Sequence, residues 1–180
     1  MAEKAMVYVG SDPWAGGLHG HVTEACRSLG HPIEEVNPAG DEERTAYHEV
    51  ARRVAVGVAT HPGSFGIVLC GTGMGVSMVA NTFPGISCAL CENVFAAERA
   101  RVLNNANVLA MGEFLTTPYV AGEIVKTFLT TEFLTGIEPG LAEQIRSWHR
   151  AVNEMKARIM VPNWADASAG GGEAERAGDD

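Results

Sequence analysis

Five short apolar runs alternate with segments of helical periodicity along the first 130 residues of this chain. The runs lie at 5–10, 33–36, 67–69, 86–91 and 108–111, and the helical segments at 18–29, 47–60, 78–81, 95–103 and 118–130. Strands that are apolar throughout and are joined by helices form parallel sheets with both faces covered. We therefore predict a three-layer, Rossmann-like α/β domain, with a five-stranded parallel sheet in the flavodoxin-like order 2-1-3-4-5 and helices on both faces.

The chain divides into three parts by composition. We expect the α/β domain to span 1–136. Residues 137–164 contain a last helical pattern with Leu141, Ile145, Trp148 and Val152 on one stripe, which must pack either on the domain or on a partner subunit. The tail 165–180 has almost no large apolar residues and is predicted to be disordered.

Charge and composition exclude several classes of protein. With 13 basic and 22 acidic residues the net charge is −9, which argues against nucleic acid or an anionic membrane as a partner. No stretch approaches the roughly 18 apolar residues of a membrane span, and the first residues do not resemble a signal peptide. We expect a cytoplasmic protein with four reduced cysteines. Cys88 and Cys91 have metal-site spacing but lie inside an apolar run, so we predict no metal and no cofactor.

The third apolar run ends at a cysteine and a glycine-rich loop. Cys70 is followed by Gly71, Gly73 and Gly75 at alternate positions, before the next helix. Such a loop can turn its amides towards a bound anion. The spacing is neither that of a P-loop nor G-x-G-x-x-G, which disfavours a nucleotide. A plain connection with a buried, apolar cysteine is the alternative interpretation.

Position in the sheet favours a functional site at this loop. Parallel sheets bind ligands at the carboxyl ends of the strands where the strand order reverses, which here lies between the first and third strands. Asp12 follows the first strand and Cys70 ends the third, so a carboxylate and a thiol are predicted to converge there. His19 and His21, near the start of the first helix, are interpreted as exposed and solvated.

Three blocks, 10–12, 70–77 and 104–112, resemble the type B ribose-5-phosphate isomerases and the galactose-6-phosphate isomerase subunits. The resemblance runs in order from about Met6 to Thr135. It implies a metal-independent aldose-ketose isomerase that acts through an enediolate on a sugar phosphate of the ribose 5-phosphate or galactose 6-phosphate type. It also implies a homodimer or homotetramer.

The same resemblance implies a role for individual residues. Cys70 is the base that moves the proton, and Thr72 forms a hydrogen bond near it. The remaining expected substrate-binding residues are Asp12, Ser11, Gly71, Gly73, Met74, Gly75, Asn104 and Tyr47. Among these, the loop amides hold the negative oxygen, Asp12 holds hydroxyls and Asn104 orients the sugar. Tyr47 either lines the crevice or caps a helix.

The chain departs from the family pattern where the far end of the substrate is recognised. Leu103 replaces the histidine associated with ring opening, Pro13-Trp14 replace His-Ala, and Glu113 replaces an arginine; 136–140 replace an arginine-rich stretch. Arg146, His149 and Arg150 are the candidates for replacement charge. Two alternatives follow from these departures: a non-catalytic or partner-completing subunit, and an isomerase of an unphosphorylated or differently charged sugar.

Overall fold

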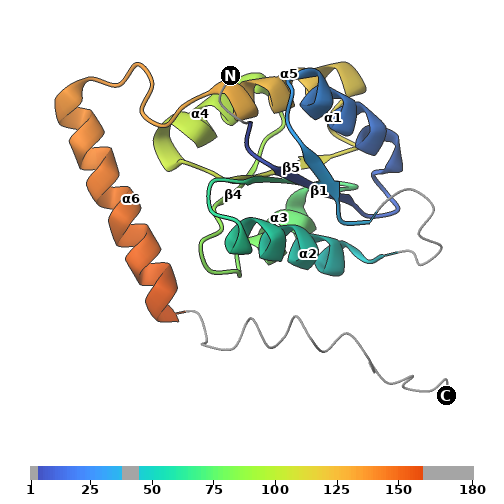
Figure 1. Cartoon of the computed structure of the whole chain (residues 1–180), viewed down its shortest axis with the longest axis horizontal. Coiled ribbons are helices and arrows are strands. Elements are labelled where there is room, and N and C mark those ends of the chain that lie inside the picture. The colour runs from blue at the N-terminus through green and yellow to red at the C-terminus, as the bar shows by residue number, and fades with distance from the viewer. Residues whose placement is uncertain (1–3, 38–44, 160–180) are drawn as a thin grey trace.

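The computed structural model describes residues 4–37 and 45–159, and shows a five-stranded parallel sheet between two layers of helices (Figure 1). The strands are β1 (Val7–Ser11), β2 (Ile33–Glu35), β3 (Phe65–Cys70), β4 (Cys88–Leu90) and β5 (Val108–Gly112). The helices are α1 (Gly16–Ser28), α2 (Tyr47–Thr60), α3 (Met74–Ala80), α4 (Val94–Asn104), α5 (Pro118–Thr130) and α6 (Pro139–Ile159). The predicted disordered tail, 165–180, lies outside the described residues.

The strand order corrects one detail of the prediction. The sheet reads β2-β1-β3-β5-β4, so the last two strands are exchanged relative to the order 2-1-3-4-5. All five residues of β5 are buried, whereas the three residues of β4 are half-buried. The longer apolar strand therefore takes the inner position and β4 forms an edge. The reversal of strand order between β1 and β3, on which the site depends, is unaffected.

Alternation along the strands divides the core into two halves. In β3, Ile67 and Leu69 pack with α1, α4 and α5, while Val68 and Cys70 pack on the side of α2 and α3. This alternation is the ordinary consequence of strand geometry, in which successive side chains point to opposite faces. It aims the last side chain of β3 at the α2 and α3 layer.

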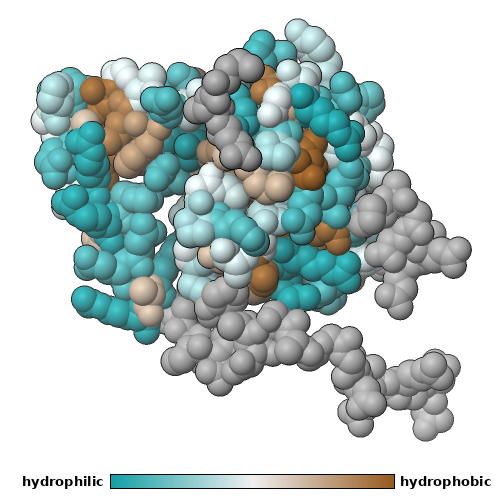
Figure 2. Space-filling view, in the orientation of Figure 1, coloured by the Kyte–Doolittle hydropathy of each residue, from teal (hydrophilic) through white to brown (hydrophobic). Residues whose placement is uncertain are grey.

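The last helix extends along one side of the body (Figure 1). Leu134, Ala142 and Ile145 form a small buried cluster that joins the start of α6 to the end of α4. Figure 2 shows apolar surface over this first part of α6 and a more polar surface farther along the helix. Trp148 is 56% exposed, so the apolar stripe predicted from the sequence is only partly covered by this chain.

Tight packing at the end of β5 gives a test of the fold. A Cβ on Gly112 would lie 2.4 Å from the carbonyl carbon of Thr72, whereas a Cβ on Gly122, in α5, meets nothing within 4 Å. We expect Gly112→Ala to lower the free energy of unfolding by about 1–3 kcal/mol. The matched variant Gly122→Ala should raise it by roughly 0.4–1 kcal/mol. Urea unfolding measures both, and a shift of the two variants in the same direction would contradict this packing.

Candidate active site

A cavity of about 310 Å³ opens at the carboxyl ends of β1 and β3. We call it the crevice; its lining residues are Asp12, Trp14, Tyr47, Cys70, Gly71, Thr72, Gly75 and Phe114. Six of these were singled out in the sequence, and the fold brings them together from the end of β1, the start of α2, β3, the loop after β3 and the start of α3. Tyr47 lines the crevice, while the residue at the cap position of α2 is Ala46.

Cys70 places a sulfur at the floor of the crevice. The side chain is 6% exposed, and its Sγ accepts a hydrogen bond of 3.0 Å from the backbone N–H of Gly73. Gly73 has a φ of 74°, and a Cβ there would lie 2.5 Å from Leu90 and 2.8 Å from the backbone of Met111. Only glycine satisfies both constraints, so this residue fixes the amide that faces the sulfur.

The other three cysteines lie elsewhere: Cys26 and Cys91 are buried in the core, and Cys88 is half-buried in β4. Burial raises the pKa of Cys26 and of Cys88 to about 12, and that of Cys91 to about 11. These three side chains therefore remain neutral thiols at physiological pH. Cys70 is the only cysteine that lines the crevice in the described part of the chain.

Asp12 supplies the carboxyl group of the crevice. Its Oδ1 accepts a hydrogen bond of 2.9 Å from the N–H of Trp14, which fixes the plane of the group. Burial raises the pKa of Asp12, and the nearby Glu113 carboxylate adds to the rise, while the Trp14 N–H acts against it. The second oxygen has no hydrogen-bond partner among residues 4–37 and 45–159 and is available to a ligand.

Ser11 points away from the crevice, because neighbouring residues of an extended chain face opposite sides. Its hydroxyl shares a hydrogen bond of 2.8 Å with Nδ1 of His19, and Nε2 of His19 lies 2.9 Å from Oε2 of Glu35. Arg27 closes this network with a bond of 2.7 Å to Glu35. The hydroxyl predicted to bind substrate is thus engaged in the structure of the protein itself.

The prediction that His19 is exposed was wrong. The side chain is buried, because α1 begins at Gly16 and places residue 19 on the same face as Val22 and Cys26. From the sequence, this helix was expected to begin at residue 18, so His19 was placed at its start and not on its buried face. His21 is exposed, as predicted.

Glu113 caps the first turn of α1. Its Oε2 accepts hydrogen bonds from the N–H groups of Gly17 (2.9 Å) and Leu18 (3.1 Å). A carboxylate is stabilised there by unpaired amides and by the partial positive charge of the helix N-terminus. The residue that replaces the family arginine therefore has a structural partner, and its negative charge is partly compensated.

Two aromatic side chains form the rim of the crevice. The rings of Trp14 and Phe114 meet edge to face, with centroids 6.3 Å apart, and their side chains are 68% and 66% exposed. Sequence reasoning treated Trp14 only as a departure from the family pattern and did not single out Phe114. Their positions in the sequence could have indicated this role, since each aromatic residue closely follows the end of an inner strand.

Asn104 does not reach the crevice of its own chain. It is the last residue of α4, which runs antiparallel to the strands and so ends near the amino ends of the strands, at the opposite end of the sheet from the crevice. There it lines a groove of about 480 Å³ with residues of α6, among them Trp148 and Val152. Met74 begins α3 and is 46% exposed, outside the crevice lining.

The crevice carries little positive charge. Asp12 is the only charged residue that lines it in the described part of the chain. Arg146 and Arg150 lie on α6 and pair with Glu143 at 3.4 and 3.5 Å. Within residues 4–37 and 45–159, no three His, Cys, Asp or Glu side chains gather as a metal site, and no helix has the length and apolar character to cross a membrane.

A doubly wound parallel sheet thus joins a cysteine and an aspartate beside a glycine loop at its switch point, the place where such sheets bind small ligands. The model of one family, described as Ribose/Galactose Isomerase, matches residues 7–145. The chain belongs to this family and is an aldose-ketose isomerase.

Individual relatives cover most of the chain. The 4-deoxy-4-sulfo-D-erythrose isomerase of Clostridium sp. (strain MSTE9) is 31% identical over 153 residues, which are 85% of this chain and 96% of the relative. The D-erythrulose-4-phosphate isomerase of Pectobacterium atrosepticum is 33% identical over 139 residues, 77% and 91% of the two chains. The solved type B ribose 5-phosphate isomerase of Leishmania infantum superposes with a TM-score of 0.77 at 28% identity, covering 88% of this chain and all of the other.

Ionisation of Asp12 gives a prediction about pH. Because its pKa is higher in the folded chain than in the unfolded chain, its ionisation opposes folding as pH rises above the unfolded value of about 3.9. Asp12→Asn should therefore be at least as stable as the parent at pH 7, and its relative stability should fall towards pH 4. Urea unfolding at the two pH values measures this. Glu24→Gln, an exposed loss of one negative charge on α1, is the control; a parent that exceeds Asp12→Asn at pH 7 would contradict the prediction.

Proposed function

We propose that this chain interconverts an aldose and a ketose with Cys70 as the base. The thiolate removes the proton from C2 of the open-chain aldose, the C2–H electron pair becomes the C1–C2 double bond of the enediolate, and negative charge moves to O1. Return of the proton to C1, with transfer of the O2 proton to O1, gives the ketose without net redox change. The observation that supports this role is that Cys70 and Asp12 line the same crevice at the switch point of the sheet.

The glycine loop supports the charge that develops during the reaction. The N–H of Gly73 already donates to Cys70 Sγ and stabilises negative charge on sulfur. Amides of Gly71 and Gly75 border the same crevice and are the donors we assign to the enediolate oxygen. Preorganised donors of this kind usually make the largest contribution to such reactions. Asp12 would bind a substrate hydroxyl through its unpaired oxygen.

Leu103 supports a substrate that does not form a ring. The family histidine at this position is associated with ring opening, and a leucine cannot transfer a proton. A four-carbon sugar whose C4 carries a sulfonate, or whose O4 is phosphorylated, has no free hydroxyl with which to close a furanose ring. Relatives named for such substrates are among the most similar proteins. We therefore assign a four-carbon aldose or ketose with an acidic group at C4 as the substrate.

The acidic crevice favours a second candidate, a four-carbon sugar without a charged group. Asp12 lines the crevice and Glu113 lies close to it, so a phosphate dianion meets no cation from this chain's described residues there. A sulfonate carries a single negative charge and suits this environment better than a phosphate. A free four-carbon sugar suits it as well, and is included in the tests below.

We also propose that two copies of the chain build the complete site. Asn104 borders the groove beneath α6 and is remote from the crevice of its own chain. Exposed apolar residues of α6, including Trp148 and Met155, provide surface for a second copy. In a homodimer or homotetramer, Asn104 and the cations Arg146 and Arg150 of one subunit would approach the crevice of the other.

Replacement of Cys70 tests the mechanism. Loss of a positioned general base typically lowers the rate by about 10²–10⁴-fold, so Cys70→Ala should lose this factor in kcat. Cys88→Ala, which removes a half-buried thiol outside the crevice, is the control and should retain kcat. Equal turnover by Cys70→Ala and the parent would refute the role of Cys70. A purified parent chain that converts no sugar of the set below would favour the partner-completing subunit instead.

Replacement of Leu103 tests the substrate. We expect the parent to turn over erythrulose 4-phosphate or 4-deoxy-4-sulfo-erythrose at least about tenfold better in kcat/KM than ribose 5-phosphate, a difference of about 1.4 kcal/mol. Leu103 lines the same groove as Asn104, so in the proposed two-copy site it would approach the crevice of the other subunit. There Leu103→His should raise activity on ribose 5-phosphate, because the imidazole can transfer the ring-opening proton. Leu103→Gln is equally polar but cannot do so and should not. A parent that prefers ribose 5-phosphate excludes the four-carbon assignment, and one that prefers free erythrulose selects the second candidate.

A further inference from the structure

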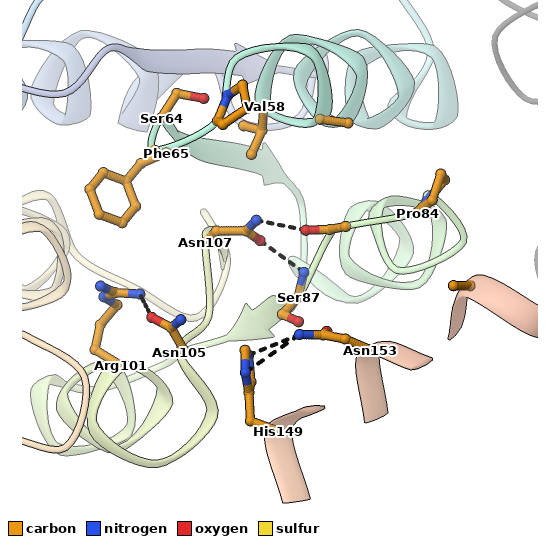
Figure 3. A pocket seen from close by; sticks show the side chains of 15 residues that line it. Val58, Ser64, Phe65, Pro84, Ser87, Arg101, Asn105, Asn107, His149 and Asn153 are labelled. Carbon is orange, nitrogen blue, oxygen red and sulfur yellow. Dashed lines mark hydrogen bonds between the residues drawn. The ribbon is translucent and has the colours of Figure 1, made fainter. Parts of the chain in front are cut away.

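A larger cavity lies at the amino ends of the strands, at the opposite end of the sheet from the crevice. It has a volume of about 590 Å³ and is enclosed by α6, the end of α2 and the loops that lead into β3, β4 and β5 (Figure 3). We call it the α6 cavity. Phe65 lines it at the start of β3, while Cys70 lines the crevice at the end of the same strand. Five residues of rise separate the two sites by roughly 16 Å, so one small ligand cannot occupy both.

A buried cation without a counter-ion borders this cavity. Arg101 is 8% exposed, and its guanidinium carbon lies 5.0 Å from the ring centre of Phe65 and 5.6 Å from that of Phe128. Its Nη1 donates to Asn105 Oδ1 (3.1 Å) and to the carbonyl of Ala106 (2.6 Å), and its Nε to the carbonyl of Thr131 (3.3 Å). All three acceptors are neutral. In the described residues no carboxylate lies within 4 Å of this guanidinium, although buried charges are normally paired.

Among the described residues, the walls of the α6 cavity carry no negative charge that would oppose Arg101. The sequence has 22 acidic residues, yet none of the residues that line the cavity in the described part of the chain is Asp or Glu. The polar lining consists of Arg101, His149, three asparagines and two serines. Lys156 of α6 reaches the same wall, where its Nζ lies 3.5 Å from the hydroxyl of Ser87.

Some hydrogen-bond donors at the cavity are used within the protein, and others are free to bind a ligand. The amide of Asn107 is fully used, because it accepts from the N–H of Ser87 and donates to the carbonyl of Gly85 (Figure 3). Arg101 Nη2 and Asn105 Nδ2 have no partner within residues 4–37 and 45–159. On the α6 side, His149 and Asn153 make only long contacts with each other, at 3.4 and 3.5 Å. These weakly engaged donors can be given to a ligand without loss of internal structure.

We propose that the α6 cavity binds the phosphate group of a small phosphorylated molecule, with Arg101 as its counter-ion and with Asn105, His149 and Asn153 as further donors. The Nε and Nη1 groups of Arg101 are used by the protein, so the N–H groups of Nη2 are the ones left to donate to a phosphate oxygen in a charge-assisted hydrogen bond. The volume also exceeds that of a phosphate group and falls within the range of small-molecule sites, which leaves space for the rest of the ligand. This site is independent of the crevice and of the reaction assigned to it.

Isosteric charge changes test the proposal in the full-length chain, with inorganic phosphate and glycerol 3-phosphate as probes in calorimetric titrations. Asn105→Asp places a carboxylate beside Arg101 and pairs the cation internally, so phosphate affinity should fall at least about tenfold, the value of one charge-assisted hydrogen bond. Asn153→Asp adds the same charge on the other wall and should weaken binding in the same direction. Asn93→Asp, at the start of α4 and outside the cavity, adds the same charge while it keeps the helix cap, and should bind within about twofold of the parent.

Stability measurements separate loss of the site from loss of the fold. Asn105 has a φ of 47°, a conformation that aspartate tolerates, and the new ion pair should leave the melting temperature of Asn105→Asp no lower than that of the parent. The proposal also requires glycerol 3-phosphate to bind at least as well as inorganic phosphate. It is overturned if the parent binds neither probe, if Asn105→Asp and Asn153→Asp both bind like the parent, or if Asn93→Asp loses affinity as much as they do.

Discussion

The contact between the end of β5 and the loop after β3 is the constraint on which the active site depends. The two strands pair so that Gly112 lies beside Cys70, and the next residues donate backbone hydrogen bonds to that loop, from Glu113 to Cys70 and from Phe114 to Gly71. A side chain at residue 112 or 73 would prevent this approach. One short stretch of backbone thus aims an amide at the sulfur, brings Phe114 to the rim and delivers Glu113 to α1.

Much of the fold and the centre of the site could be predicted from the sequence, because each depends on local patterns. Apolar runs separated by amphipathic segments determine a parallel sheet, and residues that follow the first and third strands must meet at its switch point, as Asp12 and Cys70 do. The exchange of β4 and β5 was not predictable in this way. Strands that are neighbours in sequence usually pair with each other, which favours the order 2-1-3-4-5. The inner position went instead to the longer, fully buried strand β5, a choice that depends on comparing two complete strands.

What the sequence could not predict concerns side chains whose environment is set by distant residues. His19 is buried through Ser11 and Glu35, which come from two different strands. Asn104 is expected from the family resemblance to orient the sugar, and the direction of α4 places it away from the crevice of its own chain. Glu113 stands out in the sequence only as the replacement of an arginine, and its two hydrogen bonds to α1 join residues about 95 positions apart. Helix direction and long-range polar contacts are not encoded in the spacing of a motif.

The edges of the sheet limit how copies of this protein can associate. Both edge strands, β2 and β4, contain only three residues, and each pairs on one side within the described part of the chain. So short a row of unpaired backbone groups offers little template for the addition of a foreign strand, which protects a parallel sheet against aggregation. Assembly is therefore directed to helical surfaces, where side chains rather than backbone hydrogen bonds decide which partner fits.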